Sequence, residues 1–316
     1  MRFVRFAVAA VALAAAAAHA SAPQVKTQAP AYYRFMLGSF EITVVSDGTV
    51  QLPMSKLLNN TKPEKTSATL KKAFLGDTVE TSVNAYLVNT GTKLVLIDTG
   101  AGALFGPTLG KLVANLRASG YQPEQIDEIY ITHAHPDHVG GLISNGAIVF
   151  HNATVRLDKA DVDFWTDPAK LAAAPEEQKG MFQGATAALK PYLDAKKVST
   201  FTGATELVPG VRAQPSHGHT NGHTTYVVES GGQRLVLWGD LLHVAAVQFG
   251  EPSVTIGFDT DSKAAMAVRK QALESAAKSG ELVGVTHVAF PGLGHVRAAG
   301  KGFEWVPLNY SSAVGP

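Results

Sequence analysis

Short stretches of alternating or continuous apolar residues, rich in β-branched types, recur along the chain and predict β-strands. Turn residues separate several of them: Ser46-Asp47-Gly48 follows the first stretch, and Asn89-Thr90-Gly91 joins two stretches into a hairpin. The predicted strands cover residues 40–45, 82–88, 93–97, 126–131, 147–150, 154–157, 211–214, 224–229, 234–238 and 282–286. Strands therefore dominate both halves of the chain.

Helical periodicity occurs between these strands. It predicts an amphipathic helix over residues 109–119 and a long Ala-rich helix over residues 262–278. Residues 159–194 predict a helical insert, and residues 51–80 an irregular segment with a short helix near residues 67–74. Residues 21–37 lack periodicity and are expected to form a loose arm. We therefore expect an α/β fold in which two sheets pack together with helices outside, as one domain.

The first twenty residues differ from the rest. Arg2 and Arg5 precede an apolar run over residues 6–17, and Ala18-His19-Ala20 has the small residues of a cleavage site. We interpret residues 1–20 as a signal peptide, because the apolar run is too short to span a membrane. An uncleaved N-terminal anchor is the alternative. The mature chain is then expected to be exported, periplasmic or secreted, and without a membrane segment.

Composition narrows the possible partners and ligands. Hydrophobic residues make up 46% of the 316 residues, charged residues make up 17%, and the formal net charge is +1. This balance gives no indication of a nucleic acid or an anionic membrane as partner. The chain contains no cysteine, so an exported form has no disulfide and a metal site would have to use His, Asp or Glu.

Residues 131–141, Ile-Thr-His-Ala-His-Pro-Asp-His-Val-Gly-Gly, begin at the last residue of the predicted strand 126–131. His133, His135, Asp137 and His138 fall within six residues. Imidazole and carboxylate are the usual ligands of zinc and related divalent metals. The motif offers more ligand atoms than one tetrahedral ion uses, which indicates two metals with a nucleophile shared between them. A His-rich surface loop without metal is the alternative.

Three later strands also end at candidate ligands. His219 lies in Gly218-His219-Thr220-Asn221-Gly222-His223 after strand 211–214, Asp240 follows strand 234–238, and His287 follows strand 282–286. Strand ends at one edge of a sheet converge, so we expect these groups to meet the first motif.

Other histidines have weaker claims to the site. His295 competes with His287 for the last ligand position, and we favour His287 because it directly ends a strand. His151 and His217 are expected to be solvated or capping residues.

The set His-x-His-x-Asp-His, Gly-His-Thr-x-Gly-His, Gly-Asp and a strand-end His resembles the metallo-β-lactamase superfamily of binuclear zinc hydrolases. The resemblance implies an αββα sandwich of two mixed β-sheets flanked by helices over residues 21–316, with two Zn²⁺ or other divalent ions per chain. It implies that His133, His135 and His219 bind one metal. Asp137, His138 and His287 would bind the second, and Asp240 would bridge both.

The resemblance also implies roles for groups around the metals. Asp240 and Asp137 would be catalytic through a metal-bound hydroxide that acts as the nucleophile. Asp98, in Asp98-Thr99-Gly100, is expected to orient a ligand histidine, and His223 to support its own loop.

Segments 37–42, 120–125, 244–249, 290–295 and 306–310 are similar to methyl parathion hydrolase and its relatives, over nearly the whole mature chain. That branch implies an exported homodimer that cleaves aryl phosphotriesters or opens lactones such as dihydrocoumarin. The sequence departs from the phosphotriesterase pattern at the expected pocket. His243 replaces Leu, Ile256 and Phe258 replace Thr and Leu, and Leu57 with Leu58 replaces Arg-Leu. Three of these changes make the pocket bulkier or more polar, which favours a flat lactone or aryl ester.

The predicted pocket is mainly apolar. The alternative for Phe105, Trp165 and Phe182 is that they pack in the hydrophobic core. The alternative for His243 is that it is a hydrogen-bonded loop histidine. The candidate substrate-binding residues are Leu57, Phe105, Trp165, Met181, Phe182, His243, Ile256 and Phe258.

These features favour an exported binuclear zinc hydrolase that opens small lactones and aryl esters by attack of a metal-bridging hydroxide. The sequence contains no Gly-x-Ser-x-Gly motif, which argues against an α/β-hydrolase esterase. The first alternative is a phosphotriesterase of the methyl parathion hydrolase type, and a true β-lactamase is a weaker one. A non-catalytic metal-binding protein is the alternative from another class, and the complete ligand set disfavours it.

Overall fold

The computed structural model describes residues 22–315. The predicted signal peptide, residues 1–20, lies outside the described residues. Within the described part of the chain, no helix is long and apolar enough to cross a membrane.

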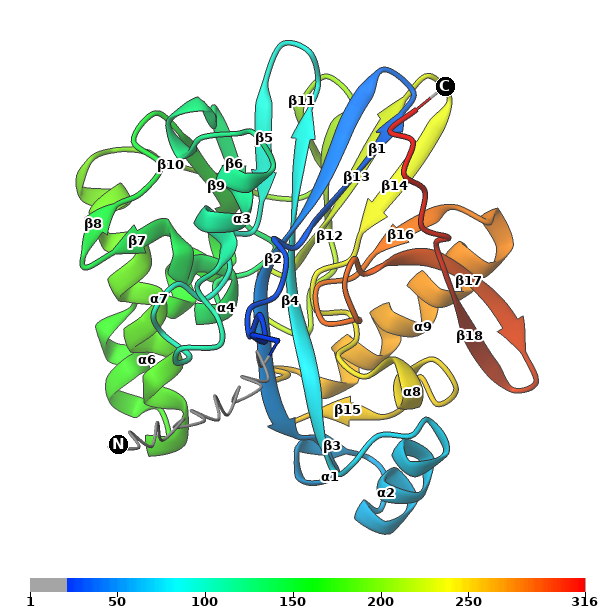
Figure 1. Cartoon of the computed structure of the whole chain (residues 1–316). Helices are drawn as coiled ribbons and strands as arrows, with labels where there is room; N and C mark the ends of the chain where they lie inside the picture. Colours follow the sequence, from blue (N-terminus) through cyan, green and yellow to red (C-terminus); the bar gives the residue numbers. More distant parts are fainter. Residues whose placement is uncertain (1–21, 316) are drawn as a thin grey trace, which may run out of the picture.

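The N-terminal half builds a mixed sheet of seven strands (Figure 1). The pairs from β1 to β5 are antiparallel, and those from β5 to β10 are parallel. In spatial order the strands are β1 (Tyr32–Leu37), β2 (Phe40–Pro53), β4 (Thr78–Asn89), β5 (Leu94–Ile97), β6 (Glu128–Tyr130), β9 (Thr154–Asp158) and β10 (Val198–Phe201).

The C-terminal half builds a second seven-stranded sheet, in which only the β14/β16 pair is parallel. Its strands are, in spatial order, β11 (Thr205–Val208), β12 (Val211–Pro215), β13 (Thr224–Ser230), β14 (Gln233–Leu237), β16 (Leu282–Gly284), β17 (Leu293–Ala299) and β18 (Gly302–Pro307). Two small sheets pair β3 (Leu58–Asn59) with β15 (Thr255–Ile256), and β7 (Ile143–Ser144) with β8 (Ala147–Ile148).

Helices cover the outer faces of both sheets. In Figure 1, α3, α4, α6 and α7 lie beside the first sheet, and α8 and α9 lie beside the second. The helices are α1 (Met54–Leu57), α2 (Pro63–Lys72), α3 (Leu112–Ala118), α4 (Pro136–Val139), α5 (Lys159–Trp165), α6 (Pro168–Ala173), α7 (Glu176–Asp194), α8 (Ala245–Gln248) and α9 (Ser262–Ser279), with 3₁₀ turns η1 (Pro123–Gln125) and η2 (Gly140–Leu142).

Strand side chains alternate between two hydrophobic layers. Val44 packs in the layer between the sheets, whereas its neighbour Val45 packs in the layer under α3 and α7. In the second sheet Tyr226 faces the first sheet, and Val227 faces α9. Because successive strand residues point to opposite faces, both faces of each sheet are covered. The predicted sandwich of two mixed sheets flanked by helices is confirmed.

Several local predictions were wrong. The loose arm over residues 21–37 contains β1, whose Tyr33 and Leu37 are buried where it pairs with β2. The irregular segment over 51–80 contains the ends of two long strands, since β2 continues to Pro53 and β4 begins at Thr78. Its helix, α2, begins at Pro63 rather than near residue 67 because proline suits the first helical turn.

Besides β1, four strands of the two seven-stranded sheets were not predicted. Strands β10 and β11 lie at the sheet edges after α7, and the hairpin β17–β18 follows residue 286, where the last predicted strand ended. Small and charged residues in Leu293–Ala299 weaken its apolar alternation. The hairpin forms because β17 pairs with β16 and extends the second sheet.

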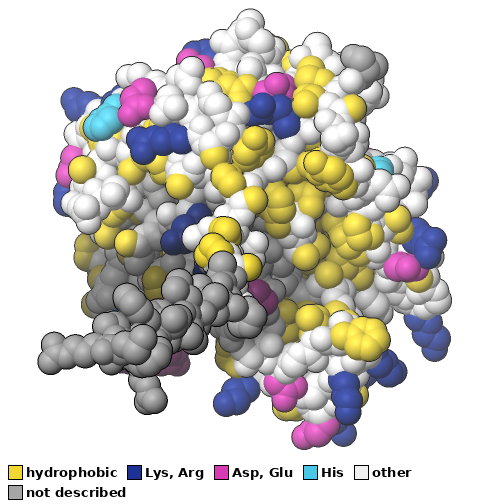
Figure 2. Space-filling view, viewed as in Figure 1, with side chains coloured by type: hydrophobic (Ala, Val, Ile, Leu, Met, Phe, Trp, Pro, Cys, Tyr) yellow, Lys and Arg dark blue, Asp and Glu magenta, His cyan; other side chains and the backbone are white. Residues whose placement is uncertain are grey.

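The face of the molecule shown in Figure 2 carries charges of both signs. On the face shown in Figure 2, Lys and Arg side chains are interspersed with Asp and Glu.

Candidate metal centre and substrate pocket

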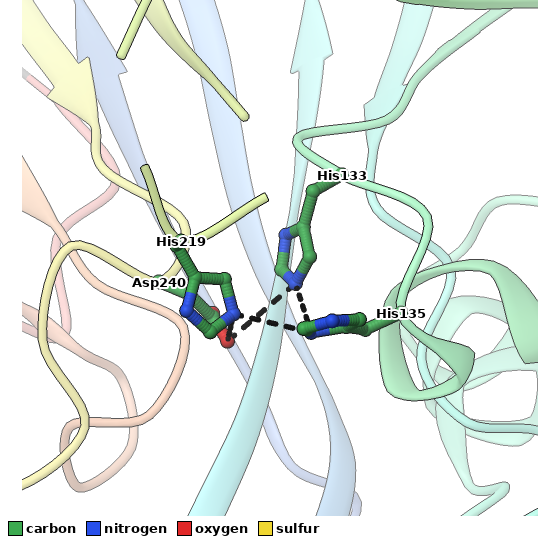
Figure 3. A group of neighbouring side chains, drawn as sticks. All are labelled: His133, His135, His219 and Asp240. Atoms are coloured by element: carbon green, nitrogen blue, oxygen red, sulfur yellow. Dashed lines mark hydrogen bonds and ion pairs between the residues drawn. The ribbon is translucent and has the colours of Figure 1, made fainter. Parts of the chain in front are cut away.

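Loops from both sheets bring the predicted ligands together. His133 and His135 lie between β6 and α4, while His219 lies in the loop between β12 and β13. Asp240 follows β14. These four side chains point toward one another from opposite halves of the sandwich (Figure 3). All four residues are buried.

The first ligand group has the spacing of atoms around one metal ion. His135 Nδ1 lies 3.0 Å from His133 Nε2 and 3.1 Å from His219 Nε2. Asp240 Oδ2 lies 3.3 Å from His219 Nε2 and 3.6 Å from His133 Nε2. Ligand atoms about 2.0–2.1 Å from a tetrahedral zinc ion are about 3.3 Å apart. The geometry and the donor set therefore fit a divalent metal.

A second group lies beside the first. His287 Nε2 is 3.4 Å from Asp137 Oδ2, and His138 Nε2 is 3.6 Å from the same oxygen. Asp240 faces both histidines, with Oδ1 3.2 Å from His138 Nε2 and Oδ2 3.1 Å from His287 Nε2. Neither His138 Nε2 nor Asp240 Oδ1 has a hydrogen-bond partner among residues 22–315, although both are buried. A second divalent ion would satisfy both atoms.

Hydrogen bonds fix which ring nitrogen faces each group. His138 Nδ1 is 2.8 Å from Asp98 Oδ2, and His219 Nδ1 is 2.8 Å from Asp259 Oδ1. His287 Nδ1 is 2.9 Å from the carbonyl oxygen of Ser82. In each case the outer nitrogen donates, so the Nε2 lone pair is directed inward.

Burial sets the protonation of part of the site. It lowers the pKa of His133 and His135 well below the usual value, and neighbouring histidines add to this effect. Burial also lowers the pKa of His243 to about 4, although Asp240 opposes it. These three rings are therefore neutral at neutral pH, the form in which a ring can bind a metal.

Carboxylates have the opposite effect on other ligands. Burial lowers the pKa of His138, but Asp240 and Asp137 outweigh it and raise the pKa well above the usual value. Asp240 and Asp259 similarly overcome burial and raise the pKa of His219 to about 9. Metal binding must displace these protons, so we expect it to tighten as pH rises.

The remaining histidines occupy distinct places. His223 accepts the N–H of Asp240 at Nε2, with a distance of 3.0 Å, and so supports the loop as expected. His295 lies on β17 with Nδ1 3.0 Å from the carbonyl oxygen of Gly280, apart from the ligand groups that contain His287. His217 is half exposed beside Asp158, and His151 is exposed.

His243 lies in direct contact with two of the predicted metal ligands, which was not expected of a hydrogen-bonded loop histidine. Its Nε2 lies 3.0 Å from Asp240 Oδ2, and its ring stacks on His287 with centroids 5.1 Å apart. Its backbone N–H donates to Gln248 Oε1, which fixes the loop. Asp240, His243 and His287 form a further group of metal-binding type.

A narrow cavity of about 70 Å³ opens onto both ligand groups. Four of the predicted substrate-binding residues line it, namely Phe105, Met181, His243 and Phe258. Its lining residues are Val50, Leu52, Phe105, Leu109, His135, Asp137, Met181, Asp240, His243, Phe258 and His287. Apart from the metal-binding groups and His243, these walls are apolar.

Four other predicted substrate-binding residues do not line this cavity. Leu57 and Ile256 pack in a hydrophobic cluster with Phe258, and Ile256 is fully buried. Trp165 contacts the His135 ring edge-on at 4.9 Å between centroids, and Phe182 packs on Trp165 at 4.7 Å. Trp165 and Phe182 belong to the core under the first sheet, the alternative considered for them.

Sequence reasoning did not find several supporting residues. Asp259 has no motif spacing that connects it to His219. Arg269, fully buried, donates to the carbonyl oxygens of Leu241 and Val254 and so ties α9 to the loop after Asp240. A signal for it existed, because Arg269 lies in the buried stripe of α9 at Ala265, Arg269, Leu273 and Ala276.

The family model for the metallo-β-lactamase superfamily matches residues 78–287, which span more than half of the chain and include all seven predicted ligands. The chain belongs to this superfamily. Among solved structures, hydrolase AbOPH of the β-lactamase superfamily is 36% identical with a TM-score of 0.85, covering 90% of this chain and 100% of its own.

Two further proteins that are similar to this chain are lactonases. AidC, a dizinc quorum-quenching lactonase solved with the product N-hexanoyl-L-homoserine, is 28% identical with a TM-score of 0.83, covering 89% of this chain and 99% of its own. An N-acyl homoserine lactonase from Bacillus cereus is 26% identical over 205 residues, 59% of this chain and 74% of that protein. The fold, the His/Asp cluster and these relatives indicate a metal-dependent hydrolase of the lactonase type. The resemblance to methyl parathion hydrolase stays a prediction.

Proposed function

We propose that this protein hydrolyses small uncharged lactones that carry an apolar acyl or aryl group, with two zinc ions per chain. The observation that carries the proposal is the cavity in which apolar walls end at two adjoining ligand groups. Phe105, Met181 and Phe258 supply apolar contact, and Asp137 and Asp240 supply negative charge that a bound metal would neutralise. The apolar walls suit an ester that carries an apolar acyl or aryl group.

Different residues of the site have different roles in the proposed reaction. When bound, divalent ions at this cluster supply Lewis acidity and activate water as the nucleophile. Asp240 faces histidines of both groups and so fixes their separation. Asp98 and Asp259 hold ligand rings in the productive orientation, and the apolar walls exclude bulk water around the ester.

His243 is the polar group of the cavity wall that belongs to neither predicted metal set. Its Nδ1 has no hydrogen-bond partner among the described residues, its Nε2 faces Asp240 Oδ2 at 3.0 Å, and the side chain is 2% exposed. We propose that it donates to an oxygen of the bound ester. Such a contact would select substrates with an oxygen beside the reacting carbonyl.

The shape of the reacting group favours lactones over phosphotriesters in a cavity this narrow. Its volume of about 70 Å³ is far below the roughly 300–1,000 Å³ of sites for drug-sized ligands. A five- or six-membered lactone ring presents a small reacting part, whereas a phosphotriester presents three ester groups at the reacting atom. Dihydrocoumarin-type lactones and aryl esters share the flat geometry, and the lactonase relatives add N-acyl homoserine lactones as candidates.

The test is a comparison of kcat/KM on N-hexanoyl-L-homoserine lactone, dihydrocoumarin, an aryl acetate and methyl paraoxon, with zinc-loaded protein. We expect one of the two lactones to exceed methyl paraoxon by at least about 100-fold, roughly 2.7 kcal/mol of transition-state preference. A higher rate on methyl paraoxon would replace the proposal with the phosphotriesterase alternative. Absence of turnover on all four compounds would favour a non-catalytic metal-binding protein.

We also propose that the protein is exported after removal of residues 1–20 and that it forms a homodimer. The sequence of the N-terminus and the resemblance to exported dimeric hydrolases support these two proposals. N-terminal sequencing of the protein from its own cells would test cleavage after Ala20. Light scattering coupled to gel filtration would test the dimer.

A further inference from the structure

Asp161, on α5, lies between the two loops that supply the three histidines of the first ligand group. It is fully buried, and its carboxylate accepts hydrogen bonds from both loops. Oδ2 accepts the N–H of Ala134 at 2.7 Å and the hydroxyl of Thr220 at 2.9 Å, while Oδ1 accepts the N–H of Gly222 at 2.6 Å. One side chain therefore joins a loop of the first sheet to a loop of the second.

The partners of Asp161 lie directly beside metal-ligand candidates. Ala134 separates His133 from His135, and Thr220 follows His219. These three histidines supply the nitrogens that lie 3.0–3.1 Å apart in the first ligand group. Any change in the separation of the two loops changes the 3.1 Å distance between His135 Nδ1 and His219 Nε2, because His219 stands on one loop and the other two histidines stand on the other.

The contact between α5 and the second loop requires close backbone approach. A Cβ atom at Gly222 would lie 2.7 Å from the backbone nitrogen of Asp161 and 2.9 Å from Cβ of Asp158. Glycine at this position therefore lets the Gly222 N–H reach the carboxylate. At the other end of the same helix, Trp165 contacts the His135 ring, so α5 touches both the backbone and the ring of the ligand loop.

A carboxylate suits this place because it accepts several hydrogen bonds and donates none when ionised. An asparagine would turn its NH₂ group toward at least one of the three donors. The loops are also joined nearer the strands, where Thr224 N donates to Thr132 O at 2.8 Å. Asp161 makes the join close to the ligands themselves.

We propose that Asp161 is a positioning residue that holds the two loops at the spacing at which His133, His135 and His219 bind one metal ion. It does not contact that metal or the substrate. The ligand group Asp137, His138 and His287 does not include a residue of the second loop. Loss of Asp161 should therefore weaken one metal site and leave the other.

The test measures zinc affinity rather than turnover, so it is independent of the substrate. Wild type, Asp161→Asn and Thr220→Val are titrated with zinc in competition with a chromogenic chelator, and the melting temperature of each metal-free protein is recorded. Asp47→Asn is the matched control, because Asp47 is equally buried and also accepts three hydrogen bonds, all from backbone N–H groups outside both ligand loops.

We expect Asp161→Asn to weaken one of the two zinc equivalents by about 10-fold or more, the range seen when outer partners of ligands are lost. Thr220→Val should shift the same equivalent in the same direction by less. Asp47→Asn should change the melting temperature but should not weaken the zinc equivalent that Asp161→Asn weakens.

Wild-type zinc affinity in Asp161→Asn would overturn the proposal, and so would equal weakening in Asp161→Asn and Asp47→Asn. If Asp161→Asn does not fold, Thr220→Val decides, since it removes only the hydroxyl that donates to Asp161. Unchanged binding of both zinc equivalents in Thr220→Val would then overturn the proposal.

Discussion

Asp47 couples the loop that covers the cavity to the stability of the fold. Its carboxylate accepts the N–H groups of Ala101, Gly110 and Leu112 at 2.9–3.0 Å, and the side chain is buried. The loop between these contacts carries Phe105, which lines the cavity. Burial raises the pKa of Asp47 from 3.8 to about 6, although the three N–H groups oppose this rise.

The raised pKa predicts how stability depends on pH. The folded protein binds the Asp47 proton more tightly than the unfolded chain, so the stabilisation is fully present below pH 3.8 and is lost as pH rises through about 6. Between pH 7.5 and pH 5, this single group should add about 1.4 kcal/mol to the free energy of unfolding. Asp47→Asn removes the titrating group and with it this increment.

Urea unfolding at pH 7.5 and pH 5 measures the effect in wild type and Asp47→Asn. The free energy of unfolding of wild type should rise relative to that of the variant by about 1.4 kcal/mol on going to pH 5. Contributions from the metal-site histidines and from Asp161 are common to both proteins and cancel in the difference. A difference that stays constant, or that changes in the opposite direction, would refute the reasoning.

Three further substitutions separate the roles assigned around the site. Phe105→Ala should raise KM for an acyl lactone roughly 5-fold with little change in kcat, because a partly exposed wall residue contributes about 1 kcal/mol of binding to the part of the substrate that does not react; steady-state kinetics check this, and a fall in kcat alone would contradict it. Phe182→Ala, a buried core position, should instead lower the free energy of unfolding by about 3–5 kcal/mol, measured in urea, and a stable variant with altered KM would place Phe182 in the pocket. Asp259→Asn should lower zinc affinity or kcat/KM by about 10-fold or more, since it weakens the partner of His219 Nδ1; metal analysis and kinetics indistinguishable from wild type would remove Asp259 from the site.

The ligand positions could be predicted from the sequence because each ligand motif follows a strand. His133, Asp240 and His287 all follow short apolar runs, and the sandwich brings the ends of those strands together. The choice of His287 over His295 rested on the same signal. His287 joins the second ligand group, whereas His295 lies on the next strand and faces the carbonyl oxygen of Gly280.

The residues that position the ligands could not be predicted from the sequence, because their hydrogen-bond partners are distant along the chain. Asp161 contacts Ala134 and Gly222, which lie 27 and 61 positions away, and no spacing rule connects them. Some residues predicted to line the pocket do not line it, for a related reason. Trp165 and Phe182 are aromatic residues of the predicted helical insert and were candidates for the pocket. The packing of α5 and α7 directs both side chains into the core under the first sheet.

Edge strands were not predicted from the sequence, because they form through pairing with a neighbouring strand although their local hydrophobic pattern is weak. Strand β1 contains Tyr33, Phe35 and Leu37 at alternate positions, yet it follows a stretch without periodicity and reads as its continuation. Pairing with β2 over six residues supplies the hydrogen bonds that make it a strand.

The central claim, that paired His/Asp groups make this chain a two-metal lactone hydrolase, is tested most directly by metal reconstitution. Protein stripped with a chelator is titrated with zinc while hydrolysis of N-hexanoyl-L-homoserine lactone and of dihydrocoumarin is followed. We predict no hydrolysis without metal and a rate that rises until about two zinc ions are bound per chain, as expected for a shared nucleophile between two ions. Hydrolysis that survives complete removal of metal, or zinc-loaded protein that opens neither lactone, would contradict the claim.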